Sequence, residues 1–451
     1  MTNQKEELKR SLKERHIQLI ALGGAIGVGL FLGSSNAIQT AGPAVLLSYL
    51  IGGLAIFVIM RALGELAIAY PVAGSFSTYA HEFLGPMYGY VTGWTYWFMW
   101  IVTCMAEITA VGIYMTYWYP ESPQWVWALM ALCFMTASNL IGVEKYGEFE
   151  FWFALIKIIT IIALLVIGGG IIFFGIGTNG HVIGLSNLYN NGGFFAKGFS
   201  GPILALVTVA YAYLGIELIG VTAGEAENPE KTLPRAINGV LWRIIIFYVG
   251  AIFVILCLYP WNKIGTQGSP FVLTFNKIGI TKAAGIINFV VLTAALSSCN
   301  SGVFSTGRML FNLANQGDAP QFLRKLNKAK VPVNGVLVSA VVLLTSVALN
   351  YLTPGKLFKY ITEVASLGAI WVWAIILISQ IKYRQNLSTE ELNSLKYKTP
   401  LYPYASYLAL AFLGLVVCML GLESSSRISL YIGIAWFTCI IFSYYIRRKE
   451  E

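Results

Sequence analysis

The chain has 451 residues, of which 57% are hydrophobic and only 11% are charged. Soluble domains carry about 25% charged residues, so this composition excludes a disordered chain, a coiled coil and an ordinary soluble enzyme. The net charge is +9, but the cations lie in loops between apolar runs and form no basic stripe interleaved with aromatics, so nucleic acid is not an expected partner. We expect an all-α polytopic membrane protein whose surroundings are the lipid bilayer.

Apolar runs in the sequence are long enough to cross a bilayer as helices. We predict twelve spans, at 16–40, 43–69, 87–118, 123–142, 147–174, 199–224, 236–259, 281–312, 333–352, 357–382, 404–421 and 428–446. No cleavage site follows the charged first residues, so we expect no removable signal peptide. Loops on the side of the N-terminus carry roughly three times as many Lys and Arg as the others, which predicts that both termini are cytoplasmic.

Glycines crowd the first span at residues 23–29 (GGAIGVG). Each Gly weakens a helix by about 1 kcal/mol relative to Ala, and a break within lipid must line a cavity because its backbone groups need partners. The half-helix after the break would offer free N–H groups to a carboxylate, and the half before it would offer carbonyls to an ammonium. The alternative, that the glycines only permit close helix packing, stays equally open. The residues assigned to this half of the site are Gly24, Ala25, Ile26, Gly27, Val28 and Gly29.

Ionisable residues occur inside two later spans. Glu107 is the only charged residue of span 3, and it is either a ligand that faces a cavity or a protonated structural acid. Lys157 lies about ten residues into span 5, too deep to reach the membrane surface easily. We favour a proton carrier at this position over a fixed structural cation. Glu148 and Glu150 open the same span, where acids stabilise a helix N-terminus, so we expect a structural role for both.

A second break is predicted in span 6, at residues 211–217 (YAYLGIE). Irregular backbone and an ionisable group, Glu217, coincide there, which favours a functional role in proton coupling. Breaks that lie five spans apart predict two inverted repeats of five spans, with the site between the breaks. Tyr211 and Tyr213 flank this break and could cover a bound ligand, but ordinary aromatic packing explains their presence equally well. The other residues assigned to substrate binding in this span are Tyr211, Ala212, Tyr213 and Gly215.

Span 8 contains the polar run 297–301 (SSCNS). Such residues either coordinate an ion or ammonium or join neighbouring helices, and both readings stay open. We assign Ser298 to substrate binding and Ser297 to proton coupling. The sequence contains no phosphate-binding loop, GxSxG or HExxH pattern, so we expect neither an enzyme nor a cofactor. The six cysteines lie inside apolar runs without ligand spacing, so we expect no metal site.

Several motifs together resemble those of the bacterial amino acid permeases of the amino acid–polyamine–organocation superfamily. They are ALGGAIGVGLFLGS, GPAVLLSY, GEFEFWFALIK, ELIGVTAGEAENPEKTLPRAI, SPFVLTF and NSGVFSTGRML. The resemblance is strongest to the branch that holds proline, threonine/serine and D-serine/alanine/glycine permeases. It implies a LeuT-type fold, with five-helix repeats at 16–174 and 199–382, two additional helices at 404–446, and cytoplasmic segments at 1–15 and 447–451.

The resemblance also implies a function, the proton-coupled import of a small neutral L-amino acid across the bacterial inner membrane. By resemblance, the α-carboxylate meets the backbone of Gly27, Val28 and Gly29, and the α-ammonium meets carbonyls of Gly24, Ala25 and Tyr211. Lys157 takes the place of a coupling sodium beside Ser297 or Ser298, and Glu107 and Glu217 match acids of relatives. Two alternatives remain, an amino-acid-sensing receptor and a permease for a cationic or aromatic amino acid. We predict no oligomeric state.

Overall fold

The structure, a computed structural model, describes residues 26–72, 75–141, 143–176, 180–222, 228–265, 268–277, 281–352, 357–423 and 426–450. Every regular element in these ranges is a helix. The α-helices are α2 (Val28–Phe31), α3 (Gly33–Ala41), α4 (Val45–Ala69), α5 (Ser75–Leu84), α6 (Pro86–Met115), α7 (Gln124–Ile141), α8 (Val143–Phe174), α9 (Ser200–Ala212), α10 (Leu218–Thr222), α11 (Pro229–Asn238), α12 (Val240–Arg243), α13 (Ala251–Leu258), α14 (Pro270–Lys277), α15 (Thr281–Gln316), α16 (Val333–Leu352), α17 (Leu357–Gln385), α18 (Thr389–Ser394), α19 (Tyr404–Leu422) and α20 (Arg427–Glu450). Single-turn 3₁₀ helices occur at η1 (Gly42–Ala44), η2 (Ser186–Leu188), η5 (Trp261–Lys263) and η6 (Gln321–Arg324), and η4 (Ile244–Gly250) is a π-helix.

Ten helical stretches of the described residues are long and apolar enough to cross a membrane. They correspond to predicted spans 2 to 5 and 7 to 12. The first stretch, Gly33–Ala69, runs from the end of predicted span 1 through span 2. Predicted span 6 is not among the ten because its first helix, α9, has only 13 residues. The first ten residues of predicted span 1 lie outside the described residues, so the count of twelve stays a prediction.

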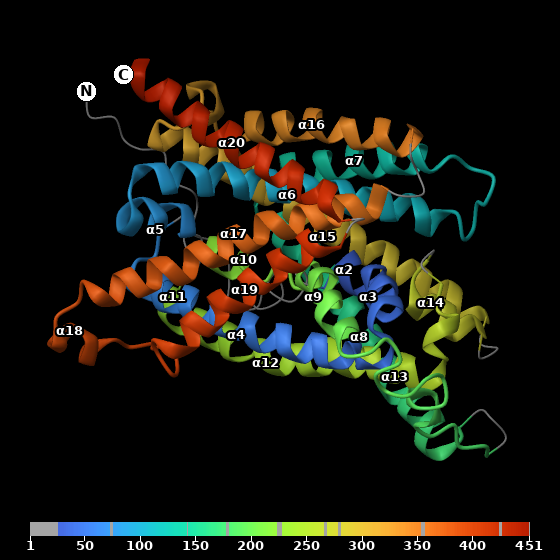
Figure 1. Ribbon diagram of the computed structural model, residues 1–451. Helices are drawn as coiled ribbons and strands as arrows, with labels where there is room; N and C mark the ends of the chain where they lie inside the picture. Colours follow the sequence, from blue (N-terminus) through green and yellow to red (C-terminus); the bar gives the residue numbers. More distant parts are fainter. Residues whose placement is uncertain are drawn as a thin grey trace.

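The long helices lie side by side in one bundle (Figure 1). Helices α7, α16 and α20 lie along one side of the view and α4, α12 and α13 along the other, with α15 and α17 between them. Helix α6 packs against both α15 and α17, and α9 packs against α3 and α4. One end of the bundle carries α5, α11, α18 and the end of α20, and the opposite end carries the connections from α6 to α7 and from α8 to α9.

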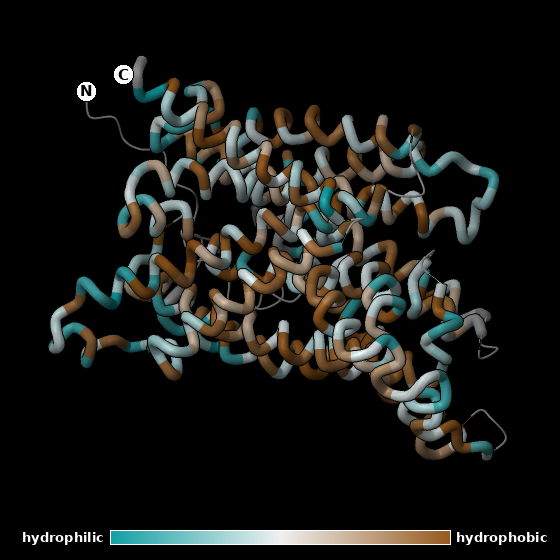
Figure 2. The backbone as a smooth tube through the Cα atoms, in the orientation of Figure 1, coloured by the Kyte–Doolittle hydropathy of each residue, from teal (hydrophilic) through white to brown (hydrophobic). Residues whose placement is uncertain are grey.

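Hydropathy follows this arrangement. Hydrophilic residues gather in the connections at the two ends of the bundle, while apolar residues run along the helices between them (Figure 2). Large apolar side chains, among them Trp152, Val166, Leu408 and Phe442, are exposed on the sides of the bundle. An apolar belt of this extent is costly in water and stable in hydrocarbon.

Helix α6, which carries Glu107, is placed by a sharp reversal of the chain after α5. Gly85 has a φ of 110°, a conformation that a residue with a side chain rarely adopts. Pro86 then occupies the first turn of α6, where its missing N–H costs no hydrogen bond. The Gly-Pro pair therefore ends one helix and starts the next without an irregular loop.

Candidate functional site

A small cavity lies where α2, α6, α9 and α15 meet. Its free volume is about 10 Å³, room for about one water molecule. Six of the twelve residues that the sequence assigned to substrate binding contribute to its walls. The lining residues are Gly27, Gly29, Thr103, Glu107, Tyr211, Ala212, Leu214 and Ser298. A ligand larger than water can enter only when these walls move apart.

The first wall of the cavity is the start of α2. Gly27 precedes this helix in an extended conformation, with φ −119° and ψ −158°. Its carbonyl accepts hydrogen bonds from the amides of Leu30 and Phe31, so the first turn of α2 is wound directly after it. Gly24 and Ala25 lie outside the described residues, so the first half of the break predicted in span 1 stays a prediction.

Glu107 of α6 forms the opposite wall, with 2% of its surface exposed. Its carboxylate interacts with the Ser298 hydroxyl and with the backbone N–H of Val28, in the first turn of α2. A β-carbon placed on Gly27 would lie 2.7 Å from its Oε1 atom and 2.9 Å from the Ser298 hydroxyl oxygen. Glycine at position 27 therefore lets the acid of α6 and the serine of α15 approach the start of α2 without being displaced.

Lys157 of α8 is fully buried beside this cavity. Its Nζ atom donates a hydrogen bond to the carbonyl of Ile26 at 3.1 Å, immediately before Gly27. Two carboxylates, Glu150 and Glu107, exert electrostatic attraction on the ammonium. The lysine thus connects α8 to the backbone that leads into α2.

Glu150 also belongs to this cluster, away from the helix N-terminus where the sequence placed it. Helix α8 begins at Val143, so Glu150 lies two turns inside the helix and is fully buried. The Ser297 hydroxyl donates to its Oε1 atom at 2.6 Å. Because seven residues separate Glu150 from Lys157, both lie on one face of α8. The seven-residue spacing within one apolar span is the feature of the sequence that could have indicated this pair. Glu148, by contrast, is exposed.

The break predicted in span 6 is confirmed. Helix α9 ends at Ala212, residues 213–217 form turns, and α10 starts at Leu218. Gly215 has a φ of 100° in the middle of the interruption, where a side chain would strain the backbone. Its N–H donates to both oxygens of Glu217, at 3.2 and 3.1 Å. The acid therefore holds the interrupted backbone in place.

Glu217 has a second hydrogen-bond partner, on α17. Its second contact is the indole N–H of Trp373, on α17, at 3.4 Å from Oε2. Among the described residues, the hydrogen bonds of Glu217 thus connect the interruption to α17. The role of Glu217 in proton coupling stays a prediction. Glu107 and Glu217 have different hydrogen-bond partners.

The two tyrosines at the end of α9 point to different places. Tyr211 lines the small cavity, and its buried hydroxyl has no hydrogen-bond partner among the described residues. It also lines a larger cavity of about 230 Å³ whose other walls include Gly33, Gln39 and Lys359. Tyr213 is directed towards α4 instead, where its hydroxyl donates to the carbonyl of Tyr49 at 2.6 Å. The structure therefore brings only the first of the two predicted tyrosines to the site.

Comparison with known proteins matches these features to one family. The sequence matches the amino acid permease family over residues 16–451. It is 60% identical to the amino acid permease YtnA of Bacillus subtilis over 445 residues, which cover 99% of this chain and 96% of the relative. From the same organism it is 51% identical to YbxG, a probable threonine/serine transporter, over 98% of this chain and 95% of the relative. It is 47% identical to the amino-acid permease AapA, over 99% of this chain and 96% of the relative.

These matches span almost the whole length of each relative, and they agree with a bundle whose helices are long and apolar enough for a membrane. The names of the family and of the relatives denote transporters and no enzyme. The chain therefore belongs to the amino acid permease family and is a multi-pass membrane transporter.

Proposed function

We propose that this permease imports a small neutral L-amino acid together with a proton, by alternating access, across the bacterial inner membrane with both termini in the cytoplasm. The observation that carries this proposal is the hydrogen bond from Lys157 to the carbonyl of Ile26. It joins a buried ionisable side chain to the backbone segment that precedes α2. A change of protonation at Lys157 therefore changes a bond at the edge of the cavity.

The substrate would bind where α2 and α9 face each other. The first turn of α2 offers backbone N–H groups to an α-carboxylate, and the carbonyls of Gly24, Ala25 and Tyr211 are assigned to the α-ammonium. The Val28 N–H interacts with the Glu107 carboxylate. An incoming substrate carboxylate would compete for that N–H group, so Glu107 would have to turn away or take up a proton.

Lys157 is suited to carry the coupled proton because it is buried between charged partners. As an ammonium it is attracted by Glu150 and Glu107 and holds the Ile26 carbonyl. As a neutral amine, Lys157 would lose its charge attraction to the two carboxylates, and its hydrogen bond to the Ile26 carbonyl would weaken. Release of the proton towards the cytoplasm would then loosen the segment before α2 and free the substrate. One unit of pH gradient is worth about 1.4 kcal/mol, and a potential of about 100 mV adds about 2.3 kcal/mol per charge.

The proposed LeuT-type arrangement has support from the described helices. The interruption between α9 and α10, and the start of α2 after an extended Gly27, lie at the positions expected for the first helices of two five-helix repeats. Helices α6 and α15, the third of each proposed repeat, pack against each other and contribute Glu107 and Ser298 to the same cavity. We propose that α2 and α9 move against this pair.

One observation favours an alternative substrate. Glu107 is a buried acid in the cavity wall, and a buried carboxylate would stabilise a cationic side chain. The name of one relative, a probable threonine/serine transporter, favours the small neutral class instead. A receptor that binds without transport is the remaining alternative.

Purified protein in proteoliposomes tests the proposal. An inward proton gradient should drive accumulation of labelled alanine, serine or threonine, and unlabelled arginine or phenylalanine should compete poorly. Lys157→Gln should bind substrate, measured by thermal shift, but accumulate none under the gradient. The control is Lys328→Gln, at an exposed loop position, which should accumulate normally. Undiminished accumulation by the Lys157 variant would remove it from the mechanism, and binding without counterflow by the unaltered protein would establish a receptor.

A further inference from the structure

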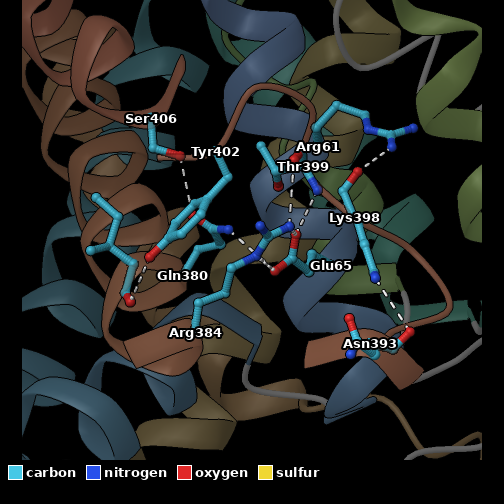
Figure 3. Close-up of polar contacts among 10 residues, drawn as sticks. Arg61, Glu65, Gln380, Arg384, Asn393, Lys398, Thr399, Tyr402 and Ser406 are labelled. Atoms are coloured by element: carbon cyan, nitrogen blue, oxygen red, sulfur yellow. Dashed lines mark hydrogen bonds and ion pairs between the residues drawn. The ribbon is translucent and has the colours of Figure 1, made fainter. Parts of the chain in front are cut away.

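We propose that residues 396–402, which connect α18 to α19, form a gate at the cytoplasmic end of the substrate pathway, held shut by Glu65 and Arg384. The gate rests on the proposed alternating-access function and extends it to residues distant from the cavity. It lies at the end of the bundle that carries α11 and α18, which the loop charges assign to the cytoplasm. Figure 3 shows its polar contacts.

The centre of the gate is a buried ion pair between α4 and α17. Nε and one terminal nitrogen of Arg384 donate to the two oxygens of Glu65, at 2.5 and 2.6 Å. The side chain of Glu65 is fully buried and that of Arg384 is 9% exposed. The Thr399 N–H donates to Glu65 at 2.6 Å, and Gln380 donates at 3.2 Å. One carboxylate therefore joins α4 to α17 and to the connecting segment (Figure 3).

The segment is attached to α17 by further contacts of its own. The Arg384 guanidinium lies 4.2 Å from the ring centroid of Tyr402. The Tyr402 hydroxyl donates to the carbonyl of Ile381 at 3.5 Å, and the Ser406 hydroxyl at the start of α19 contacts Gln380 at 3.2 Å. These contacts remain satisfied if α17, the segment and α19 move as one unit.

A second set of contacts joins the segment to α4 and α11. Arg61 of α4 donates to Asn238 of α11 at 2.6 Å and to the carbonyl of Lys398. Its guanidinium lies 3.9 Å from the ring centroid of Tyr397, whose hydroxyl contacts Asn238 at 2.9 Å. The Arg61–Asn238 bond lies within the side formed by α4 and α11. The contacts of Lys398 and Tyr397, together with those of Glu65, cross a boundary between that side and α17 with the segment.

An exposed ion pair crosses the same boundary. Nζ of Lys396, in the segment, lies 2.9 Å from Oε2 of Glu230, in the first turn of α11. Both side chains are more than half exposed. Both residues, with Glu65 and Tyr397, also line a cavity of about 330 Å³ at this end of the bundle. The boundary is therefore bordered by open space into which its two sides can separate.

Helix α17 connects the gate to the interrupted helix of the site. Trp373 donates to Glu217 at the interruption, and Gln380 and Arg384 donate to Glu65. Spacings of seven and eleven residues place these three donors on one face of α17. On the other side of the boundary, α4 packs against α9, the helix that ends at the interruption. Movement of α4 and α9 against α6 and α17 must therefore separate Glu65 from its donors.

A reversible crosslink tests whether the boundary opens during transport. Glu230→Cys and Lys396→Cys place two exposed thiols across it, and a short bis-methanethiosulfonate reagent joins them without disturbing the buried pair. The matched control, Asn393→Cys with Lys398→Cys, joins two exposed positions on the segment side alone, where Lys398 donates to the Asn393 carbonyl at 3.3 Å. Treated unaltered protein corrects for the six native cysteines.

Counterflow of labelled amino acid is the readout. We expect the crosslink across the boundary to reduce counterflow to the level of protein-free vesicles, and reducing agent to restore it, while the control pair stays active. Full counterflow in completely crosslinked protein would show that the two sides of the boundary do not separate during transport, and would overturn the proposed gate. Counterflow needs no proton gradient, so the two proposals can fail separately. If proton coupling is wrong, uptake will not depend on the gradient, but the crosslink will still block counterflow.

Discussion

Gly29 and Ala212 bring the two proposed substrate-binding helices into direct backbone contact. A β-carbon on Gly29 would lie 2.6 Å from the Cα of Ala212, closer than real side-chain contacts. Position 29 therefore tolerates no side chain while α2 and α9 keep this packing. The contact lies between α2 and α9, at the wall of the small cavity.

We predict that Gly29→Ala blocks transport. The added methyl group must push α2 away from α9, which displaces the backbone groups proposed to hold the substrate. Uptake into proteoliposomes should be lost and the melting temperature should fall. Gly414→Ala on α19, where a β-carbon meets nothing within 4 Å, is the control. That variant should transport normally and gain up to about 1 kcal/mol of helix stability. Normal uptake by the Gly29 variant would contradict the contact.

Glu150→Gln should reduce gradient-driven uptake more than substrate binding. The substitution keeps the size of the side chain and an oxygen for Ser297, but it removes one of the two negative charges that face Lys157. Proton-driven accumulation and thermal shift with substrate should be measured on the same preparation. Glu148→Gln, two residues away and exposed, provides the matched control. Equal losses in both variants would argue against a specific role for Glu150.

The sequence predicts most helices well because each span needs a long apolar run. The spans predicted at 333–352 and 404–421 agree with α16 and α19 to within one residue. The start of span 5 was predicted at 147, whereas α8 begins at Val143. That shift of one turn moved Glu150 from the helix start to its interior. A small error of boundary thus concealed a member of the charged cluster.

Contacts between distant segments could not be read from one chain. Glu65 and Arg384 are 319 residues apart, and their pairing depends on how α4 and α17 pack. The directions of Tyr211 and Tyr213 were also beyond the sequence, because a helix that ends between them leaves no regular periodicity to follow. The interruption at YAYLGIE was readable because backbone conformation is encoded locally.

Tyr211→Phe separates a substrate-binding role from a packing role. The hydroxyl is buried and has no hydrogen-bond partner within the described part of the chain, so its removal should leave the melting temperature unchanged or raise it. Stabilisation by added amino acid should decrease, because the hydroxyl borders the cavity. Tyr213→Phe is the contrasting variant, since it loses the bond to the Tyr49 carbonyl and about 1 kcal/mol of stability. Unchanged stabilisation by substrate in the Tyr211 variant would remove that hydroxyl from recognition.

Removing one partner of the Glu65–Arg384 pair should cost more than removing both charges. Arg384→Gln leaves the Glu65 carboxylate buried beside fewer donors, and breaking such a pair costs about 3–5 kcal/mol. The double variant Glu65→Gln with Arg384→Gln buries no charge and should recover part of that loss. Thermal unfolding of the two single variants and the double variant measures the coupling. Additive losses would show that the two side chains act independently.

Glu391 should make the end of the bundle at α18 sensitive to acid. Its carboxylate accepts the Ser388 N–H at 2.8 Å in a capping box, and these hydrogen bonds lower the pKa of Glu391 from its ordinary value of 4.5. Because the folded-state pKa is lowered, the stabilisation is present above the ordinary value and is lost as pH falls through the folded pKa. Hydrogen exchange of the α18 amides, corrected for intrinsic rates, should accelerate between about pH 5 and 3. Glu391→Gln should abolish this acceleration, and Glu390→Gln, outside the capping box, should keep it.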